Sequence, residues 1–311
     1  KAAARLTESI GRQVGALPVA PAVQAAIPTE VSTLHRLLGS LPDSRHFRHH
    51  AGNPLALDVL VVDEASMIDL EMMANVLAAL PPQARLVLLG DKDQLASVEA
   101  GAVLGDLCRR ADAGCYSPAT VDWLQQVSGQ SLAGSGLQPG DESTHLLEQQ
   151  TAMLRHSHRF GSDSGIGELA RAVNRCDATA ARDLLQRGLF ADIHSRRLTD
   201  LRDPGFAALV LGSEGGLPGY GAYLSTLQAQ RPGADAAADD PRWQAWAGDV
   251  LREFDRFQLL CAVRRGDWGV EGINQRVADL LSRRGLLHAD KLWYEGRPVL
   301  VTRNDYSLGL M

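Results

Sequence analysis

The sequence predicts an α/β protein with mainly parallel sheets, divided into two domains. Two apolar runs rich in Val and Leu, residues 57–62 and 85–89, are typical of parallel strands that are buried on both faces. A helical pattern lies between them, so strand, helix and strand predict a right-handed crossover unit. The length of 311 residues favours two domains, which we expect to cover residues 1–150 and 151–311.

Composition narrows the class of protein. With 45% hydrophobic and 22% charged residues the chain is typical of globular proteins, and no apolar run approaches the ~18 residues of a membrane span. No signal-peptide pattern follows Lys1, and the four cysteines lack CxxC spacing, which favours reduced thiols. The net charge of -6 means that any contact with a nucleic acid must be local. We therefore expect a cytoplasmic protein without membrane contact.

In the first half, helical patterns occupy residues 1–17, 31–38, 70–80 and 102–111. Asp69 can cap the third of these helices, and Pro81-Pro82 ends it. The loop 39–54 contains His46, His49 and His50, but no carboxylate or Cys stands at ligand spacing, which favours a solvated loop over a metal site. The Gly/Ser-rich stretch 128–142 predicts an inter-domain linker or a long exposed loop.

The second half continues the alternation of helices and strands. Helices are expected at residues 165–175, 179–187, 243–257 and 270–284, and strands at 258–263 and 298–302. Residues 201–241 are rich in Gly, Pro, Ala and Asp with weak periodicity, so we expect an insertion or a flexible loop there.

Two carboxylates directly follow the first expected strand. In open α/β sheets ligands bind at the carboxyl ends of the strands, and Asp63 and Glu64 stand at such an end. In nucleotide hydrolases the first carboxylate of such a pair holds Mg²⁺ through its water shell and the second polarises the attacking water. An acidic loop without function remains an alternative, because carboxylates are frequent at strand ends.

The next strand also ends in polar residues, Gly90-Asp91-Lys92-Asp93-Gln94. The glycine permits a tight turn, and Gln94 could contact both a terminal phosphate and the attacking water. Two polar groups at neighbouring strand ends favour a functional site.

A third candidate is Arg159 in the run Arg155 to Phe160. An arginine beside an aromatic residue can supply the bidentate and permanently charged donor that developing phosphate charge requires. The alternative is a salt bridge between domains.

These residues lie in motifs that resemble a known family. Residues 59–108, with VVDEAS at 61–66 and GDKDQL at 90–95, resemble motifs II and III of superfamily 1 DNA helicases, and among them the RecD family, the alpha subunits of exodeoxyribonuclease V. HRFGSDSGIG at 158–167 resembles motif IV, residues 1–6 resemble the end of motif Ia, and residues 293–310 resemble a strand region of the second motor domain. One departure is His158, where the family more often has Tyr.

The resemblance implies two RecA-like domains of the P-loop NTPase type, the first truncated at its N-terminus and the second at its C-terminus. Motifs Ia, II and III fall in residues 1–150, and motif IV falls in 151–311. A phosphate-binding P-loop needs Gly-Lys followed by Ser or Thr, and neither Lys1, Lys92 nor Lys291 precedes such a residue. In the family the P-loop lies upstream of the matched region and motifs V and VI lie downstream, so we expect the chain to be the middle of a motor.

For the intact protein the resemblance implies an ATP-dependent helicase that moves 5′ to 3′ on one DNA strand. It also implies action within a complex with the beta and gamma subunits, in double-strand-break repair. The expected roles are Mg²⁺ binding through water for Asp63, water activation for Glu64, phosphate sensing for Gln94 and an arginine finger for Arg159. Lys1 and Arg5 are candidates for contact with the DNA backbone.

Two other functions are compatible with parts of the pattern. A metal-dependent nuclease could be built from Asp63, Glu64, Asp91 and Asp93, although motifs II and III already assign these residues and the family's nuclease belongs to the beta subunit. A non-enzymatic role in docking the partner subunits describes the 311 residues themselves better, because we expect them to leave ATP intact.

Overall fold

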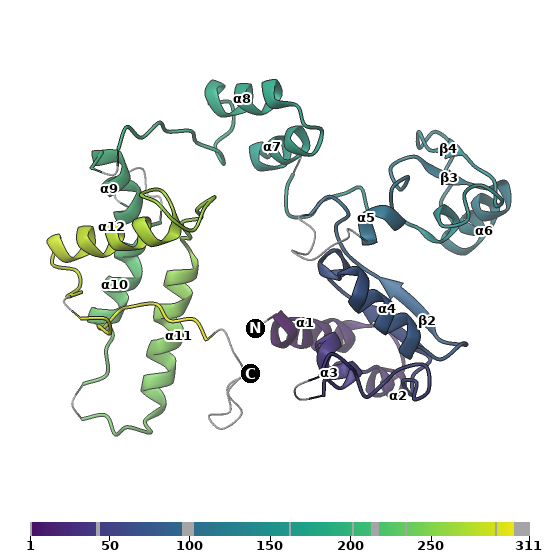
Figure 1. Ribbon diagram of the computed structural model, residues 1–311, viewed down its shortest axis with the longest axis horizontal. Helices are drawn as coiled ribbons and strands as arrows, with labels where there is room; N and C mark the ends of the chain where they lie inside the picture. The colour runs from purple at the N-terminus through teal and green to yellow at the C-terminus, as the bar shows by residue number, and fades with distance from the viewer. Residues whose placement is uncertain are drawn as a thin grey trace. The chain divides into compact units, whose positions relative to one another are not determined.

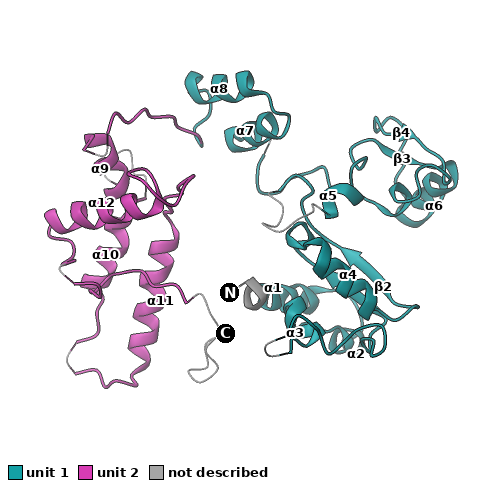
Figure 2. Ribbon diagram, in the orientation of Figure 1, with its two compact units in different colours: residues 1–192 teal, residues 193–311 magenta. Residues whose placement is uncertain are grey.

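The computed structural model describes residues 2–41, 44–94, 103–161, 163–200, 202–212, 218–233, 235–289 and 291–301, and for residues 2–5 only the backbone. The chain divides into two compact units, residues 1–192 and 193–311 (Figure 2). The expected boundary at residue 150 lies inside unit 1, so the two expected domains remain a prediction. Within the described ranges, no helix is both long and apolar enough to cross a lipid bilayer.

Unit 1 is α/β with two small parallel sheets. Its elements are α1 (Ala2–Ala16), α2 (Pro21–Ala26), α3 (Leu34–Leu38), β1 (Val59–Val62), η1 (Ala65–Met67), α4 (Leu70–Ala79), β2 (Arg85–Leu88), α5 (Val103–Leu107), β3 (Gly114–Tyr116), α6 (Pro118–Ser128), β4 (Gln138–Pro139), η2 (Glu148–Gln150), α7 (Gly165–Asn174) and α8 (Ala178–Arg187). Strand β1 pairs with β2, and β3 pairs with β4, both in parallel.

The predicted strand, helix and strand at 57–89 are confirmed. The Asp69 side chain accepts a hydrogen bond from the Met72 amide at 2.7 Å and so caps α4, which ends at Ala79 before the two prolines. Figure 1 shows α4 running along the strands. Its buried Met73 and Val76 pack with Leu60 of β1 in one core, to which α3 and α5 also contribute.

The expectation that the two strands are buried on both faces is wrong, since Arg85 and Val87 of β2 are also exposed. Burial alternates along β1, with Leu60 and Val62 inside while Val59 and Val61 are 52% and 56% exposed. In the described part of unit 1 the core packs against one face of this sheet, and the other face carries the exposed valines.

The Gly/Ser-rich stretch after α6 is an exposed loop, as one alternative predicted, and it is not a linker between the units. Ser117 caps α6, Pro118 occupies its first turn, and Gly129 ends it at φ 70°. Strand β4 then returns to pair with β3 inside unit 1. Neither α6 nor β3 and β4 is among the elements expected from sequence.

The expected helix at 102–111 is shorter than predicted. Helix α5 ends at Leu107, and a turn with hydrogen bonds from the Ala111 and Gly114 amides to the Cys108 and Arg110 carbonyls follows. Residue 102 lies outside the described residues.

Unit 2 consists of helices in the described residues. Its elements are α9 (Pro204–Leu211), α10 (Tyr220–Ala229), α11 (Pro241–Asp255) and α12 (Val270–Arg283). Phe206, Val210, Leu224, Ile273 and Leu281 form the centre of its core.

The expectation of a flexible loop at 201–241 is wrong, because α9 and α10 lie there, and the alternative of an insertion stays a prediction. Asp203 caps α9 through its side chain, Pro204 starts it and Gly212 ends it at φ 77°. Val210 and Leu224 are 0% and 1% exposed, so these two helices supply the centre of the unit 2 core.

The strands expected at 258–263 and 298–302 are also not formed in the described residues. Both segments are irregular up to residue 301, and residue 302 lies outside the described part. Leu260 is 90% exposed and Leu300 is 73% exposed. A strand needs a neighbouring strand for its backbone hydrogen bonds, and in this structure neither segment pairs with one.

Candidate functional site

The carboxyl ends of β1 and β2 lie side by side because the two strands are parallel. Val62 is in register with Leu88. Beyond that pair, the Leu89 amide donates to the Val62 carbonyl at 2.8 Å, and the Ala65 amide donates to the Leu89 carbonyl at 2.9 Å. The residues after both strands therefore share one edge of the sheet.

Asp63 and Glu64 occupy the first of these ends. Both side chains are exposed, and the Glu64 amide donates to Asp63 Oδ1 at 2.9 Å. The backbone of Glu64 is left-handed, with φ 54°, a conformation that non-glycine residues rarely adopt. Ala65, the next residue, is completely buried. The turn thus presents the Glu64 carboxylate to solvent beside a buried residue.

Gln94, after β2, is joined to this turn through Ser66. Ser66 is a residue that is 6% exposed, and its hydroxyl donates to Gln94 Oε1 at 3.3 Å. A Cβ atom on Gly90 would lie 3.1 Å from the Ala65 nitrogen, so glycine is what allows the second loop to approach the first turn. The structure brings Asp63, Glu64 and Gln94 to the same edge, as the sequence predicted.

Ser66 is a functional candidate that only the folded chain reveals. Its only signal is its position two residues after Glu64, within the same turn, because its partner lies 28 residues away.

The loop between Gly90 and Gln94 is held by its own charges. The Asp93 amide donates to Asp91 Oδ1 at 3.0 Å. Lys92 Nζ lies 2.8 Å from Asp93 Oδ1 and 3.0 Å from Asp112 Oδ2. Hydrogen bonding to Asp93, opposed by partial burial and supported by Asp112, raises the pKa of Lys92, which stays protonated.

The structure does not bring Arg159 to the strand ends. Arg159 lies in unit 1 on the exposed segment before α7, where its amide donates to the Ser157 hydroxyl at 3.3 Å. Within the described residues no hydrogen bond or ion pair joins its side chain to Asp63, Glu64 or Gln94. Its neighbour His158 packs edge-on against His156, with ring centroids 4.6 Å apart.

The two candidates for DNA contact cannot be placed in the same way. Lys1 lies outside the described residues, and the side chain of Arg5 also lies outside them, although its backbone belongs to α1.

The exposed carboxylates suit a Mg²⁺ ion that is held through water. Asp63 Oδ1 already accepts the Glu64 amide, which leaves Oδ2 open to solvent water. In the part of the chain that the structure describes, no group of three or more His, Cys, Asp or Glu side chains is arranged for direct metal binding. A Mg²⁺ ion bound by one carboxylate, water and substrate phosphates needs no such group.

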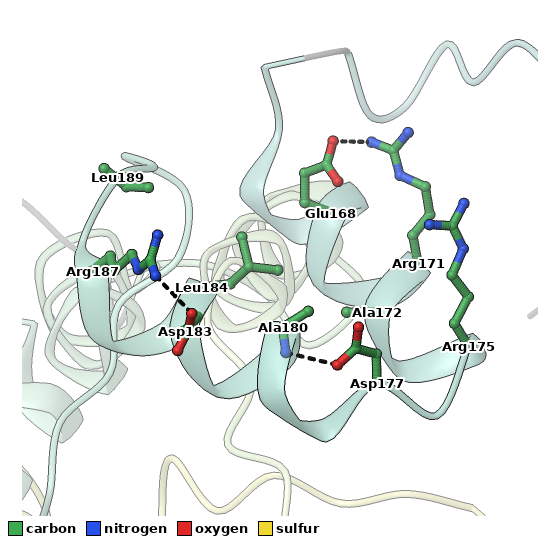
Figure 3. A pocket seen from close by; sticks show the side chains of 10 residues that line it. All are labelled: Glu168, Arg171, Ala172, Arg175, Asp177, Ala180, Asp183, Leu184, Arg187 and Leu189. Atoms are coloured by element: carbon green, nitrogen blue, oxygen red, sulfur yellow. Dashed lines mark hydrogen bonds and ion pairs between the residues drawn. The ribbon is translucent and has the colours of Figure 1, made fainter.

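Two cavities lie away from this edge. One, of about 300 Å³, opens between α7 and α8 (Figure 3). Four of its charged side chains form ion pairs with one another, Arg171 with Glu168 and Arg187 with Asp183. The other, of about 820 Å³, is lined in unit 2 by α10, α12 and the segments around Leu259 and Tyr294. Neither contains a residue that the sequence predicted for the site.

Comparison with known proteins identifies relatives along the whole chain. A family model described as an AAA domain matches residues 1–100. The chain is 35% identical to the RecBCD enzyme subunit RecD of Haemophilus influenzae, over 100% of this chain and 48% of that protein. It is 37% identical to the RecBCD enzyme subunit RecD of Mycolicibacterium smegmatis, over 100% of this chain and 45% of that protein.

A further relative matches about half of the chain. The ATP-dependent RecD2 DNA helicase of Deinococcus radiodurans is 39% identical over 48% of this chain and 22% of that protein. The chain spans about half the length of the RecD proteins that it matches.

Proposed function

This chain belongs to the family of the RecBCD enzyme subunit RecD, and on that premise we propose that the whole protein is an ATP-dependent DNA helicase that moves 5′ to 3′. It works as the alpha subunit of an exodeoxyribonuclease V complex with the beta and gamma subunits, on the DNA of double-strand breaks. Because that DNA lies in the bacterial cytoplasm, the protein acts there.

One observation carries the proposal: Asp63 and Glu64 share a sheet edge with Gln94, and the Ser66 hydroxyl joins the two strand ends at 3.3 Å. Ligand chemistry in α/β sheets is concentrated at this edge. Two carboxylates and an amide there match what hydrolysis of a terminal phosphate requires, namely a metal-holding group, a group that orients water and a group that contacts the phosphate.

Each side chain has a role in this proposal. Asp63 holds the water shell of Mg²⁺, and the ion, when bound, neutralises charge on the phosphate oxygens. Glu64 orients the attacking water and accepts its proton. Gln94 contacts the terminal phosphate. Its hydrogen bond from the Ser66 hydroxyl couples this contact to the turn after β1. Arg159 stabilises the charge of the transition state once the motor closes on the nucleotide.

The phosphates of ATP need a cradle that these 311 residues do not contain, because no lysine precedes Ser or Thr. We therefore assign the P-loop to another part of the whole protein. Lys1 and Arg5 remain candidates for the DNA backbone.

The whole protein has two RecA-like domains in this proposal. In the described residues unit 2 consists of helices, so a sheet in the second domain rests on the family alone.

The experiment is to assemble the whole protein with its beta and gamma subunits and to follow ATP hydrolysis and duplex unwinding. Hydrolysis should depend on single-stranded DNA, and duplexes with a 5′ overhang should be unwound while those with a 3′ overhang are unwound only by other subunits. A complex in which Asp63→Ala leaves both activities unchanged contradicts the proposal.

The two alternatives give different results in the same system. A nuclease of this chain would cleave DNA with Mg²⁺ in the absence of ATP, and the cleavage would be lost with Asp91→Ala. A docking module would bind the partner subunits and leave ATP hydrolysis by the complex unaffected by Glu64→Gln.

A further inference from the structure

We propose that Lys92, Asp112 and Arg155 form a positioning relay that fixes the Gln94 loop relative to the segment bearing Arg159. The inference rests on the proposed function, because the reaction for which these groups are positioned is ATP hydrolysis. None of the three relay residues contacts the reacting atoms.

The first half of the relay is the ion pair between Lys92 and Asp112. Lys92 stands two residues before Gln94, and its side chain is 17% exposed, so the stem is packed while Nζ reaches two carboxylates. One of them, Asp93 at 2.8 Å, belongs to the same loop. The other, Asp112 at 3.0 Å, lies 20 residues further along the chain in the turn between α5 and β3. Lys92 therefore ties the loop after β2 to a separate element.

The second half leads from Asp112 to the segment before α7. Arg155 Nη2 donates to the Asp112 carbonyl at 2.7 Å and to the Ala111 carbonyl at 3.4 Å. A second hydrogen bond, from the Tyr116 hydroxyl to the Thr151 carbonyl at 2.6 Å, holds the same segment four residues earlier. Asp112 thus forms an ion pair with Lys92 through its carboxylate and accepts a hydrogen bond from Arg155 through its backbone carbonyl.

Lys92 and Arg155 each stand close in sequence to the proposed functional residue that they support. Arg155 is four residues before Arg159, and Gln94 is two residues after Lys92. A shift of the Gln94 loop is passed through Asp112 to the Arg155 segment, and a shift of that segment is passed back. The relay gives the sensor of the terminal phosphate and the arginine that acts on it a shared support.

The exposure of the charged groups indicates that the ion pairs of Lys92 position the loop and add little to the stability of the fold. Asp112 is 61% exposed and Asp93 is 39% exposed, and ion pairs that are open to solvent contribute little to the free energy of unfolding. They do restrict geometry, and a misplacement of about 1 Å can lower a rate by about a hundredfold.

The first arm of the test measures amide hydrogen exchange in the whole protein, assembled with its partner subunits. Lys92→Met, which keeps the stem and removes the charge, should accelerate exchange at least about threefold both in the 90–94 loop and in residues 155–160. Asp112→Asn should do the same and serves if the first variant does not fold. The matched control is Arg187→Met, which breaks the exposed 2.8 Å pair with Asp183 and should alter neither segment.

The second arm measures DNA-stimulated ATP turnover by the whole protein without the beta and gamma subunits, so that ATP hydrolysis by other subunits does not contribute. Lys92→Met and Asp112→Asn should each lower kcat about tenfold while the KM for ATP stays within about twofold, because binding groups are intact and their alignment is lost. The double variant should be no slower than the slower single variant, since both remove one link. Lys92→Arg should restore most of the rate.

The outcomes separate the two claims. The relay would be overturned if amide exchange became faster only in the 90–94 loop. It would also be overturned if the losses in kcat multiplied in the double variant Lys92→Met/Asp112→Asn. A wild-type whole protein that shows no DNA-stimulated turnover without its partner subunits contradicts the proposed function instead, and the exchange arm alone then decides on the relay.

Discussion

Glu64 follows β1 with a left-handed backbone, at φ 54°, and this conformation sets the direction of its carboxylate. For a residue with a Cβ the left-handed region costs about 1–2 kcal/mol, and such strain is frequent at functional sites. The turn tolerates it because the Glu64 amide is bonded to Asp63 Oδ1 and Ala65 is anchored by its bond to Leu89. The strained backbone at Glu64 thus lowers the stability of the fold while it holds the Glu64 carboxylate at the sheet edge.

Replacing Glu64 by glycine should therefore stabilise the chain while removing its proposed water-activating group. We expect Glu64→Gly to raise the free energy of unfolding by about 0.5 kcal/mol, since glycine adopts positive φ without strain. Urea denaturation measures the change. The control is Glu71→Gly in the first turn of α4, which should lower stability by a similar amount because glycine disfavours a helix. Equal losses in the two variants would contradict the strain at residue 64.

Arg159 tests whether a group outside the strand ends takes part in hydrolysis. In the whole protein, assayed without its partner subunits, Arg159→Ala should leave the melting temperature nearly unchanged and lower ATP turnover by on the order of 10³–10⁵. Arg159→Lys should rescue little, because an ammonium does not reproduce the planar fork of the guanidinium. Melting and turnover are measured on the same preparation, and normal turnover per folded molecule rules out the finger.

At this scale the sequence predicted the residues whose neighbours along the chain reveal them. Asp63 and Glu64 directly follow one apolar strand pattern, and Gln94 lies in the loop after the next, so their shared edge could be inferred. Ser66 and Lys92 were not singled out, because their partners lie 28 and 20 residues away and only the folded chain brings them together.

Among the elements, the two loops at the sheet edge depend on a glycine. A Cβ on Gly90 would lie 2.8 Å from Leu104 Cδ2 and 3.1 Å from the Ala65 nitrogen, so Gly90→Ala should push the second loop away from the first turn. We expect a loss of about 1–2 kcal/mol in the free energy of unfolding. Gly11→Ala is the control: it lies inside α1 with no atom within 4 Å of its Cβ, so alanine should stabilise it by up to about 1 kcal/mol. If Gly90→Ala and Gly11→Ala changed the free energy of unfolding in the same direction, the close approach at Gly90 would be contradicted.

Elements with a local signal were predicted well, and elements that depend on distant partners were not. Asp69 and Pro81 set the limits of α4, and both can be read from the sequence. Helix α9 was missed because it is apolar nearly all around, with Phe206 and Val210 in the core, and such a short helix has no clear period. The segment 258–263 has the period of a strand, but the described residues supply no strand beside it.

At the scale of the whole molecule, nucleotide binding should require more than this chain. The 311 residues contain no lysine followed by Ser or Thr, so the triphosphate has no P-loop amides or lysine to hold it. The purified chain alone should neither hydrolyse ATP nor bind it below millimolar concentration, as titration calorimetry measures. Hydrolysis that persists in this preparation and disappears with Glu64→Gln would contradict that expectation.

The central claim is that the edge formed by Asp63, Glu64 and Gln94 hydrolyses ATP, and Glu64→Gln in the whole protein, assayed without the beta and gamma subunits, tests it most directly. The amide keeps the size of the side chain and loses the group that accepts the proton of water. We predict that the variant binds ATP as the wild type does and hydrolyses it at least about a thousandfold more slowly, whereas Glu71→Gln on the neighbouring helix leaves both unchanged. Turnover within about tenfold of the wild type, a difference of ~1.4 kcal/mol, would contradict the claim.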